Sequence, residues 1–200
     1  MDSAATPLVV LLGLDEALAA AWRTEFGEWA GEVEVRGAPV ETVLGEVDAV
    51  VAAGNSYGEM SGGVDLALAR ALPEVQRRVW RRIDERHLGY QPVGTAEIVP
   101  TGRSGCRWLV YAPTMRVPMP LEGGLEIAVH DAFWAALTAI GRHNARSGVE
   151  ERIGSFACPG LGTGTGRVPP TRAAALMAAA YRCWRTSPAS PALRERLLDG

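Results

Sequence analysis

Lysine is absent from this chain of 200 residues, and all 20 of its basic residues are arginines. Without a lysine, the protein can neither form a Schiff base nor use a P-loop lysine or a lysine nucleophile. The net charge of −3 gives no electrostatic reason to expect a nucleic-acid partner. Arginines do cluster within residues 77–86, but the acidic residues among them, at helical spacing, favour a solvated helix face.

Cysteine and histidine are scarce, with three of each. Cys106, Cys158 and Cys183 are odd in number and widely spaced, which fits neither a disulfide framework nor a zinc site. We interpret all three as buried, reduced thiols. No two histidines share an H-x-x-x-H spacing, so we expect neither a metal nor another cofactor.

Long apolar runs are also missing. The N-terminal run, residues 8–14, is short, has no basic segment before it and no cleavage site after it, and therefore predicts a buried strand. No other stretch approaches the length that spans a bilayer. From these absences we expect a cytoplasmic protein without a membrane partner. The oligomeric state is left open.

The length fits one domain with a sizeable core. We expect this domain to cover residues 1–186, with residues 1–31 forming its N-terminal strand and helix. A Ser-Pro-rich break then precedes a C-terminal tail or short helix over residues 187–200.

Strand and helix patterns alternate along the chain, which predicts an α/β fold with a mixed sheet covered on both faces. We expect strands over residues 8–14, 32–36, 49–53, 95–100, 107–112 and 153–158. We expect helices over residues 16–26 with Asp15 as the cap, from residue 64 to about 72, from Pro73 onward, over 125–146, and over 170–184. The helix that begins at Pro73 is predicted to bury Val75, Val79, Trp80 and Ile83.

Two glycine-rich loops, residues 54–65 and 160–166, each follow a buried strand and precede a helix. Ligands of such sheets bind beyond the carboxyl ends of the strands, where both loops would lie. Gly62 and Gly63 fall at a helix N-terminus, where free N–H groups and the helix dipole favour a phosphate. The two loops therefore predict one cleft for a nucleotide diphosphate. The alternative for the first loop is a long strand-to-helix turn in which the glycines only satisfy backbone geometry.

The residues of both loops carry a resemblance to a known family. The segment DAVVAAGNS, residues 48–56, followed by Gly62-Gly63-Val64-Asp65, resembles the signature of macrodomains. The segment FACPGLGTG, residues 156–164, and the following Pro169 resemble the second loop of that family. The similarity covers about residues 33–184.

This resemblance implies a three-layer α/β/α macrodomain-like fold that binds ADP-ribose. Several macrodomains remove ADP-ribose from proteins or hydrolyse O-acetyl-ADP-ribose. By resemblance, Asn55 holds the distal ribose, and Asp65 matches the aspartate that orients the attacking water in MacroD-type hydrolases. These two are the expected catalytic residues. The expected ligand-binding residues are Gly54, Asn55, Ser61, Gly62, Gly63, Val64, Met115, Gly160, Leu161, Gly162, Thr163, Gly164, Thr165 and Gly166.

The chain also departs from the family pattern. Ala38 replaces the aspartate that recognises the adenine amino group, so Asp15 either substitutes for it or only caps a helix. Gly166 stands near the place of the usual second-loop tyrosine, and Ala69 stands where MacroD-type enzymes often carry histidine. Packing on the sugar could come instead from Tyr57, Met60 or Met115. The lysine-dependent mechanism is excluded, and Glu59 has no neighbour to form the paired glutamates of poly(ADP-ribose) glycohydrolases.

Three functional interpretations follow. The first is hydrolysis of a mono-ADP-ribosyl ester or of O-acetyl-ADP-ribose, with Asp65 as a base whose pKa a neighbouring diphosphate raises. The second is a non-catalytic reader or sensor of ADP-ribose or an NAD metabolite, in which Asp65 only stabilises the helix N-terminus. The third is a serine esterase, because Ser56 lies in a G-x-S-x-G motif, although no histidine follows His143.

Overall fold

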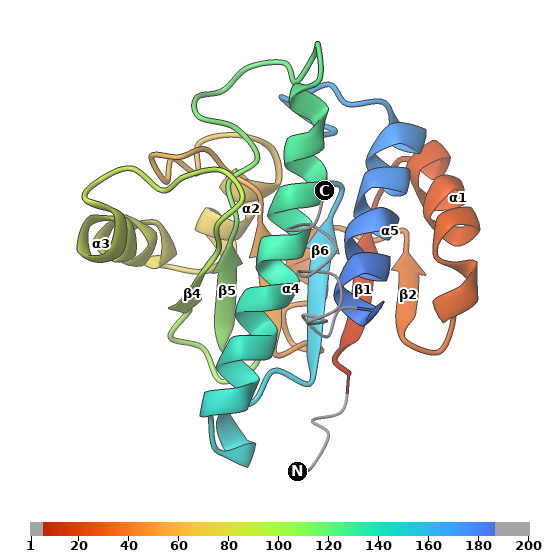
Figure 1. The fold of residues 1–200 in the computed structure, drawn as a ribbon. Coiled ribbons are helices and arrows are strands. Elements are labelled where there is room, and N and C mark those ends of the chain that lie inside the picture. The colour runs from red at the N-terminus through yellow and green to blue at the C-terminus, as the bar shows by residue number, and fades with distance from the viewer. Residues whose placement is uncertain (1–5, 187–200) are drawn as a thin grey trace, which may run out of the picture.

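A six-stranded sheet in the order β2-β1-β6-β3-β5-β4 forms the centre of the computed structural model, which describes residues 6–186 (Figure 1). The strands are β1 (Leu8–Leu12), β2 (Val33–Arg36), β3 (Ala49–Ala52), β4 (Glu97–Pro100), β5 (Trp108–Tyr111) and β6 (Ser155–Pro159). Neighbouring strands are parallel except for β4, which pairs antiparallel with β5. The predicted mixed sheet is therefore confirmed.

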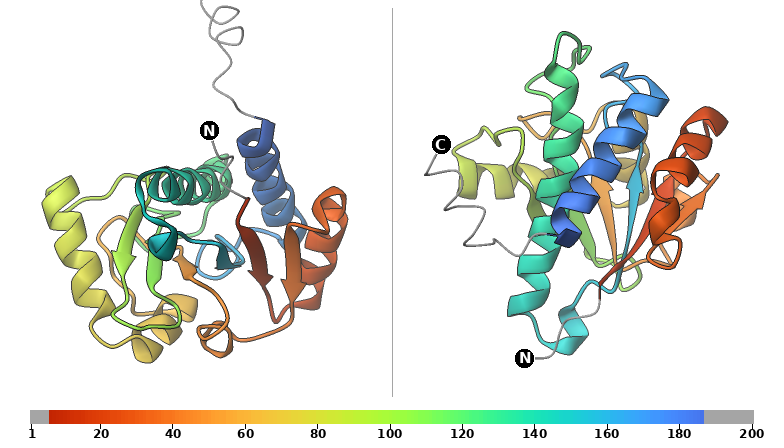
Figure 2. Two further views of the ribbon diagram at one scale, coloured as in Figure 1. Left: turned by 90° about the horizontal axis from the view of Figure 1, so that it is seen from below. Right: turned by 45° about the vertical axis from the view of Figure 1, so that its right-hand side comes forward.

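Helices cover both faces of the sheet, which gives the three layers expected (Figures 1 and 2). The helices are α1 (Glu16–Glu25), α2 (Gly63–Ala71), α3 (Val75–His87), α4 (Ala128–Arg146) and α5 (Pro170–Thr186). Short 3-10 turns lie at Gly27–Trp29, Val40–Thr42, Leu125–Ile127 and Val149–Glu151. Within residues 6–186, none of these helices is long and apolar enough to cross a membrane.

The sheet separates two hydrophobic cores, because successive strand residues point to opposite faces. Val9 and Leu11 of β1 pack with α1, α4 and α5, whereas Val10 and Leu12 pack with α2 and α3. All four of these side chains are buried. This burial on both faces explains the continuous apolar runs by which the central strands were predicted.

Two side chains that were predicted to be buried are exposed. Trp80 is 46% exposed, because it follows the buried Val79 by one residue and so lies about 100° around α3. Cys183 is also exposed, because α5 buries the face that carries Met177 and Tyr181. Cys106 and Cys158 are buried free thiols as predicted, and burial raises the pKa of Cys106 to about 12.

Several element ends also differ from the prediction. Helix α3 begins at Val75 rather than at Pro73, because Glu74 has a φ of 68° and this left-handed conformation cannot continue a helix. Asp15 does cap α1, since its Oδ1 accepts a hydrogen bond from the N–H of Ala17 at 2.8 Å. The predicted C-terminal tail or helix, residues 187–200, lies outside the described residues.

Asp48 joins three neighbouring strands at the edge of the sheet opposite the glycine-rich loops. Its Oδ2 accepts hydrogen bonds from the N–H groups of Gly154 and Ser155 at 2.8 and 3.1 Å. Its Oδ1 accepts one from Arg107 Nη2, just before β5, at 3.2 Å. Because Asp48 itself precedes β3, this one carboxylate fixes the starts of β3, β5 and β6 relative to one another.

We predict that Asp48→Ala lowers the free energy of unfolding by about 2–4 kcal/mol, because two backbone N–H groups and a guanidinium lose a charged acceptor. The matched control is Glu46→Ala, which breaks only an ion pair to Arg36 in which Glu46 is largely exposed, and should change stability by less than about 1 kcal/mol. Urea unfolding of both variants measures the difference. Equal effects of the two substitutions would refute this role of Asp48.

Candidate functional site

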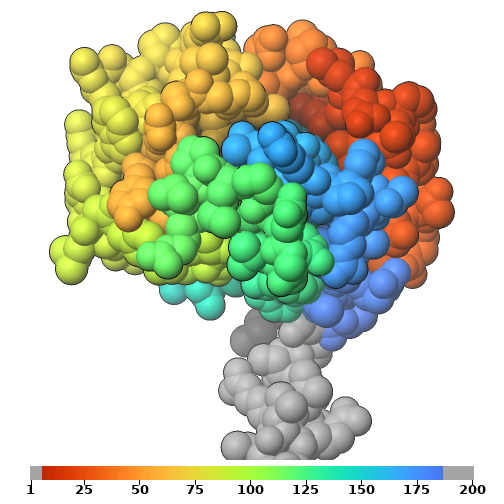
Figure 3. Space-filling view, turned by 90° about the horizontal axis from the view of Figure 1, so that it is seen from above, coloured from red at the N-terminus to blue at the C-terminus, as the bar shows by residue number. Residues whose placement is uncertain are grey.

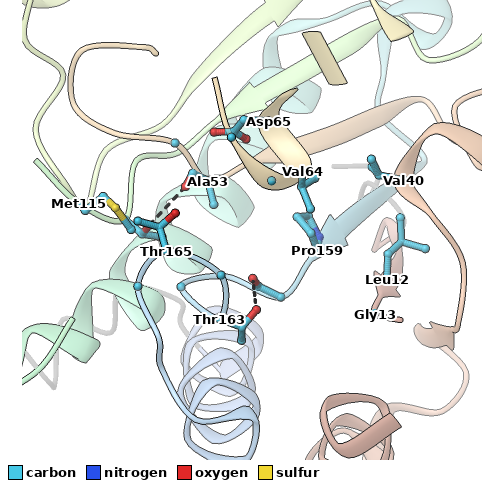
Figure 4. Close-up of a pocket in the computed structure, with 18 of the residues that line it drawn as sticks. Leu12, Gly13, Val40, Ala53, Val64, Asp65, Met115, Pro159, Thr163 and Thr165 are labelled. Carbon is cyan, nitrogen blue, oxygen red and sulfur yellow. Dashed lines mark hydrogen bonds between the residues drawn. The ribbon is translucent and has the colours of Figure 1, made fainter. Parts of the chain in front are cut away.

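A cleft of about 440 Å³ opens beyond the carboxyl ends of β1, β3 and β6. Figure 3 views the molecule from this side, and Figure 4 shows the residues around the cleft. The lining consists of residues 12–15, Leu18, residues 38–40, residues 53–55, Glu59, residues 61–65, Thr114, Met115, Pro118, Pro159, Gly160 and residues 162–166. Both glycine-rich loops thus contribute to one cleft.

The first loop is held at Asn55 by the strand next to it. Tyr111, the last residue of β5, donates a hydrogen bond from its hydroxyl to the carbonyl of Asn55 at 2.8 Å. Asn55 also forms an isolated bridge with Met115, and its side-chain oxygen accepts the N–H of Tyr57 at 3.0 Å. These contacts fix the backbone of Asn55 at the cleft wall.

Helix α2 points its N-terminus into the cleft. Gly62 is its N-cap residue and Gly63 its first residue, and no side chain caps this end by a hydrogen bond in the described structure. The first N–H groups of a helix have no partner within the helix, and the helix dipole gives them a partial positive charge. The start of α2 can therefore bind an anion that enters the cleft.

Asp65 lies in the first turn of α2, close to the backbone of Gly54. A Cβ atom at Gly54 would come within 2.8 Å of Oδ2 of Asp65 and would clash with the hydroxyl of Tyr111. No hydrogen bond within residues 6–186 reaches the Asp65 carboxylate, and burial raises its pKa to about 7. The pKa of Tyr111 is raised by burial and, next, by the nearby charge of Asp65. Asp65 can therefore take up or release a proton near neutral pH.

The second loop is a tight turn whose backbone faces the cleft. Gly162 has a φ of 72°, and a Cβ there would meet Val129 at 2.7 Å, so only glycine fits. Its carbonyl accepts the N–H of Val168 at 3.0 Å. Thr163 donates its hydroxyl to the carbonyl of Gly160 at 2.9 Å. These hydrogen bonds join residues of the loop to one another, and the backbone of its glycines lines the cleft.

The structure brings nearly all the sequence-predicted site residues to this cleft, including Asn55, Ser61, Asp65 and Met115. Leu161 is the exception, because its side chain is buried in the core on the α4 and α5 face. Two residues considered for packing on the sugar also lie elsewhere. Met60 is buried in the opposite core, and Tyr57 packs edge-on against Tyr90.

The sequence prediction missed one wall of the cleft. Residues 12–14, Leu18, Pro39 and Val40 come from the turn after β1, from α1 and from the segment after β2. Figure 4 shows Leu12, Gly13 and Val40 together on one side, opposite Ala53, Met115 and Thr165. Ligands of such sheets bind beyond the carboxyl ends of the strands. Applied to the first strand as well, this rule would have predicted that the turn after β1 lines the cleft.

Other candidate groups lie outside this arrangement. Ser56 is fully buried and its hydroxyl is 3.4 Å from the carbonyl of Met115, so it is not placed as an accessible nucleophile. The arginine cluster of α3 lines a separate groove, where Arg77 pairs with Glu74 and Arg78 donates to the carbonyl of Pro100. Among residues 6–186 there is no group of three or more side chains suited to hold a metal ion.

Comparison with known proteins agrees with this geometry. Residues 51–177 match the family model described as Macro domain. An uncharacterised protein of Mycobacterium tuberculosis is 32% identical over 76% of this chain, although the chain spans only 37% of that protein. An uncharacterised protein of Pyrobaculum aerophilum is 31% identical over 76% of each chain.

Solved structures show the same fold at lower sequence identity. The macrodomain of Mycobacterium tuberculosis DarG matches with a TM-score of 0.56 and 22% identity, over 70% of this chain and 85% of its own. The Oceanobacillus iheyensis macrodomain, solved with ADP, matches with a TM-score of 0.55 and 19% identity, over 70% and 72%. A mutant of it, solved with ADPR, has the same TM-score. With the sheet order, the two loops and the family match in agreement, this chain belongs to the macrodomain family.

Proposed function

We propose that this protein binds ADP-ribose in the cleft and hydrolyses the bond between the distal ribose and a carboxylate, as in a mono-ADP-ribosyl ester or O-acetyl-ADP-ribose. The observation that carries the proposal is the position of Asp65, a carboxylate with a pKa near 7 in the first turn of the anion-binding helix. The family match and the macrodomain structures titled with ADP and ADPR support the choice of ligand.

The diphosphate would be held by backbone rather than by side-chain cations. No arginine or histidine is among the described residues that line the cleft. The start of α2 and the glycines of the second loop instead offer N–H groups on both sides of the diphosphate. Close approach of these groups requires residues without side chains, which both loops supply.

The distal ribose would lie at the end of the cleft where Asn55, Thr114 and Asp65 are found. On O-acetyl-ADP-ribose, the water would attack the ester carbonyl, and Asp65 would pass the proton on to the departing ribose oxygen. On a mono-ADP-ribosyl ester, Asp65 accepts a proton from a water molecule as the water oxygen attacks the anomeric carbon. The bond from that carbon to the leaving oxygen breaks, and the acyl group departs as a carboxylate. This leaving group needs no proton, so a single carboxylate in the site suffices.

Free thiols are also consistent with a cytoplasmic protein, which we propose as its location.

We predict that Asp65→Asn lowers turnover of ester-linked ADP-ribose and of O-acetyl-ADP-ribose by about 100-fold or more. The dissociation constant for ADP-ribose should change less than about threefold, because the amide keeps the shape of the side chain. Product release and calorimetry measure the two quantities on the same samples. Full activity in the variant would refute the role of Asp65. Binding without turnover in the unchanged protein would instead identify a reader.

We also predict that kcat/KM of the unchanged protein rises with pH between about 5.5 and 8, with a midpoint near pH 7. The reason is that only the ionised Asp65 can accept the proton, and its pKa is about 7. Glu59→Gln should keep this midpoint, because Glu59 is an exposed carboxylate of the same cleft. A midpoint near pH 4, typical of an exposed aspartate, would contradict the assignment.

The same burial predicts a stability effect. Because the pKa of Asp65 is higher in the folded than in the unfolded state, the folded protein holds the proton more tightly, and this contribution to stability is lost as pH rises from about 4 to about 7. Asp65→Asn should therefore be more stable than the unchanged protein by roughly 4 kcal/mol at pH 8 and by only about 1 kcal/mol at pH 4.5. Urea unfolding at both pH values checks this, with the exposed Glu41→Gln as the control. A destabilised variant at pH 8 would contradict it.

A further inference from the structure

The two ends of the cleft differ in chemistry. The polar groups of Asn55, Thr114 and Asp65 come from the segments after β3 and β5 and from the start of α2, whereas the wall formed by β1, α1 and the segment after β2 carries Leu12, Leu18 and Val40. Figure 4 shows Leu12 and Val40 on this wall. A nucleotide diphosphate shows the same asymmetry, because a ribose is ringed with hydroxyls and a base has two apolar faces. The base therefore fits the wall of leucine and valine side chains.

Leu14 gives this wall an unusual feature. Its side chain lines the cleft and yet is 74% exposed, at the turn between β1 and α1. A base lying in the apolar end would cover Leu14 and remove apolar surface from water. Ala38 and Pro39 also line the cleft, from the segment after β2.

The edge of an adenine ring also needs a hydrogen-bond acceptor, because its exocyclic amino group is a donor that is costly to bury without a partner. Ala38 and Pro39 offer no side-chain acceptor. Among the described lining residues of this end, Asp15 has the only carboxylate.

Asp15 has one oxygen available for such a contact. Its Oδ1 accepts the N–H of Ala17 as the cap of α1, at 2.8 Å. Within residues 6–186, no hydrogen bond reaches Oδ2. A carboxylate has about four lone-pair positions, so capping the helix leaves acceptor capacity. The cap bond also holds the side chain in one orientation.

We propose that Asp15 recognises the base of the bound nucleotide, with Oδ1 capping α1 and Oδ2 accepting a hydrogen bond from the adenine amino group. This inference rests on the proposed binding of ADP-ribose. It gives base recognition to the turn after the first strand rather than to the segment that carries Ala38. Such a contact would select nucleotides whose purine base carries a hydrogen-bond donor at position 6.

The test compares ADP-ribose with its analogue that has unsubstituted purine in place of adenine, which lacks only the amino group. For the unchanged protein, calorimetry should give a dissociation constant about 10- to 100-fold higher for the purine analogue, because a hydrogen bond to a charged group is lost. Equal affinities would overturn the inference while leaving the proposed function intact. If neither nucleotide binds, the proposed function fails, and this inference fails with it.

Two variants separate recognition from helix capping. Asp15→Ser keeps a good N-cap, but its single side-chain oxygen is taken by the N–H of Ala17, so the preference for adenine should fall to less than about threefold. Asp15→Asn also keeps the cap, but with its single oxygen on the N–H of Ala17 it turns an NH2 donor toward the adenine amino group, so it should lose the preference as Asp15→Ser does. Unfolding curves check that both variants fold. An undiminished preference for adenine in Asp15→Ser would refute the role of Asp15.

Discussion

The missing side chain at Gly54 is the constraint on which the functional site depends. At the end of β3, the hydroxyl of Tyr111 and the carboxylate of Asp65 both occupy space that any other residue at position 54 would fill. Tyr111 uses this space to reach the carbonyl of Asn55, and so fixes the first loop against β5. Asp65 uses it to lie beside the backbone, where burial raises its pKa to about 7. One glycine thus sets both the shape of the loop and the protonation of its acid.

This arrangement places an acid that is costly to ionise at the position where the proposed reaction needs a base. A half-buried carboxylate without a hydrogen-bond partner reduces stability at neutral pH, and carboxylates with raised pKa values are frequent at sites of function. Asp48 illustrates the contrast, because its carboxylate accepts hydrogen bonds from two N–H groups and an arginine at the far edge of the sheet. Asp48 is thus stabilised in its ionised form by its hydrogen-bond donors, whereas Asp65 is not. Asp65 faces the cleft.

The sequence predicted the parts of the fold whose signals are local. Glycines at fixed positions after a buried strand marked both loops, and the structure brings them to one cleft. The wall of Leu12, Leu18 and Val40 was missed because the rule on strand carboxyl ends was applied only to the strands before the two glycine-rich loops. The place of β1 beside β6 depends on pairing of residues about 150 positions apart. The predictions for Leu161 and Trp80 were wrong, although a residue next to each behaves as expected. Gly160 and Gly162 line the cleft beside the buried Leu161, and Val79 is buried beside the exposed Trp80. The sequence alone does not show which of two adjacent residues is buried.

In the proposed function the two glycine-rich loops act as one nucleotide site. Their resemblance to the macrodomain signature concerns the proposed phosphate side of the cleft, whereas the proposed base side is formed by β1, α1 and the segment after β2. The most direct test of the central claim is a calorimetric titration of the full chain with ADP-ribose. The account predicts saturable binding with one ADP-ribose per chain, and a titration without saturable heat would contradict it.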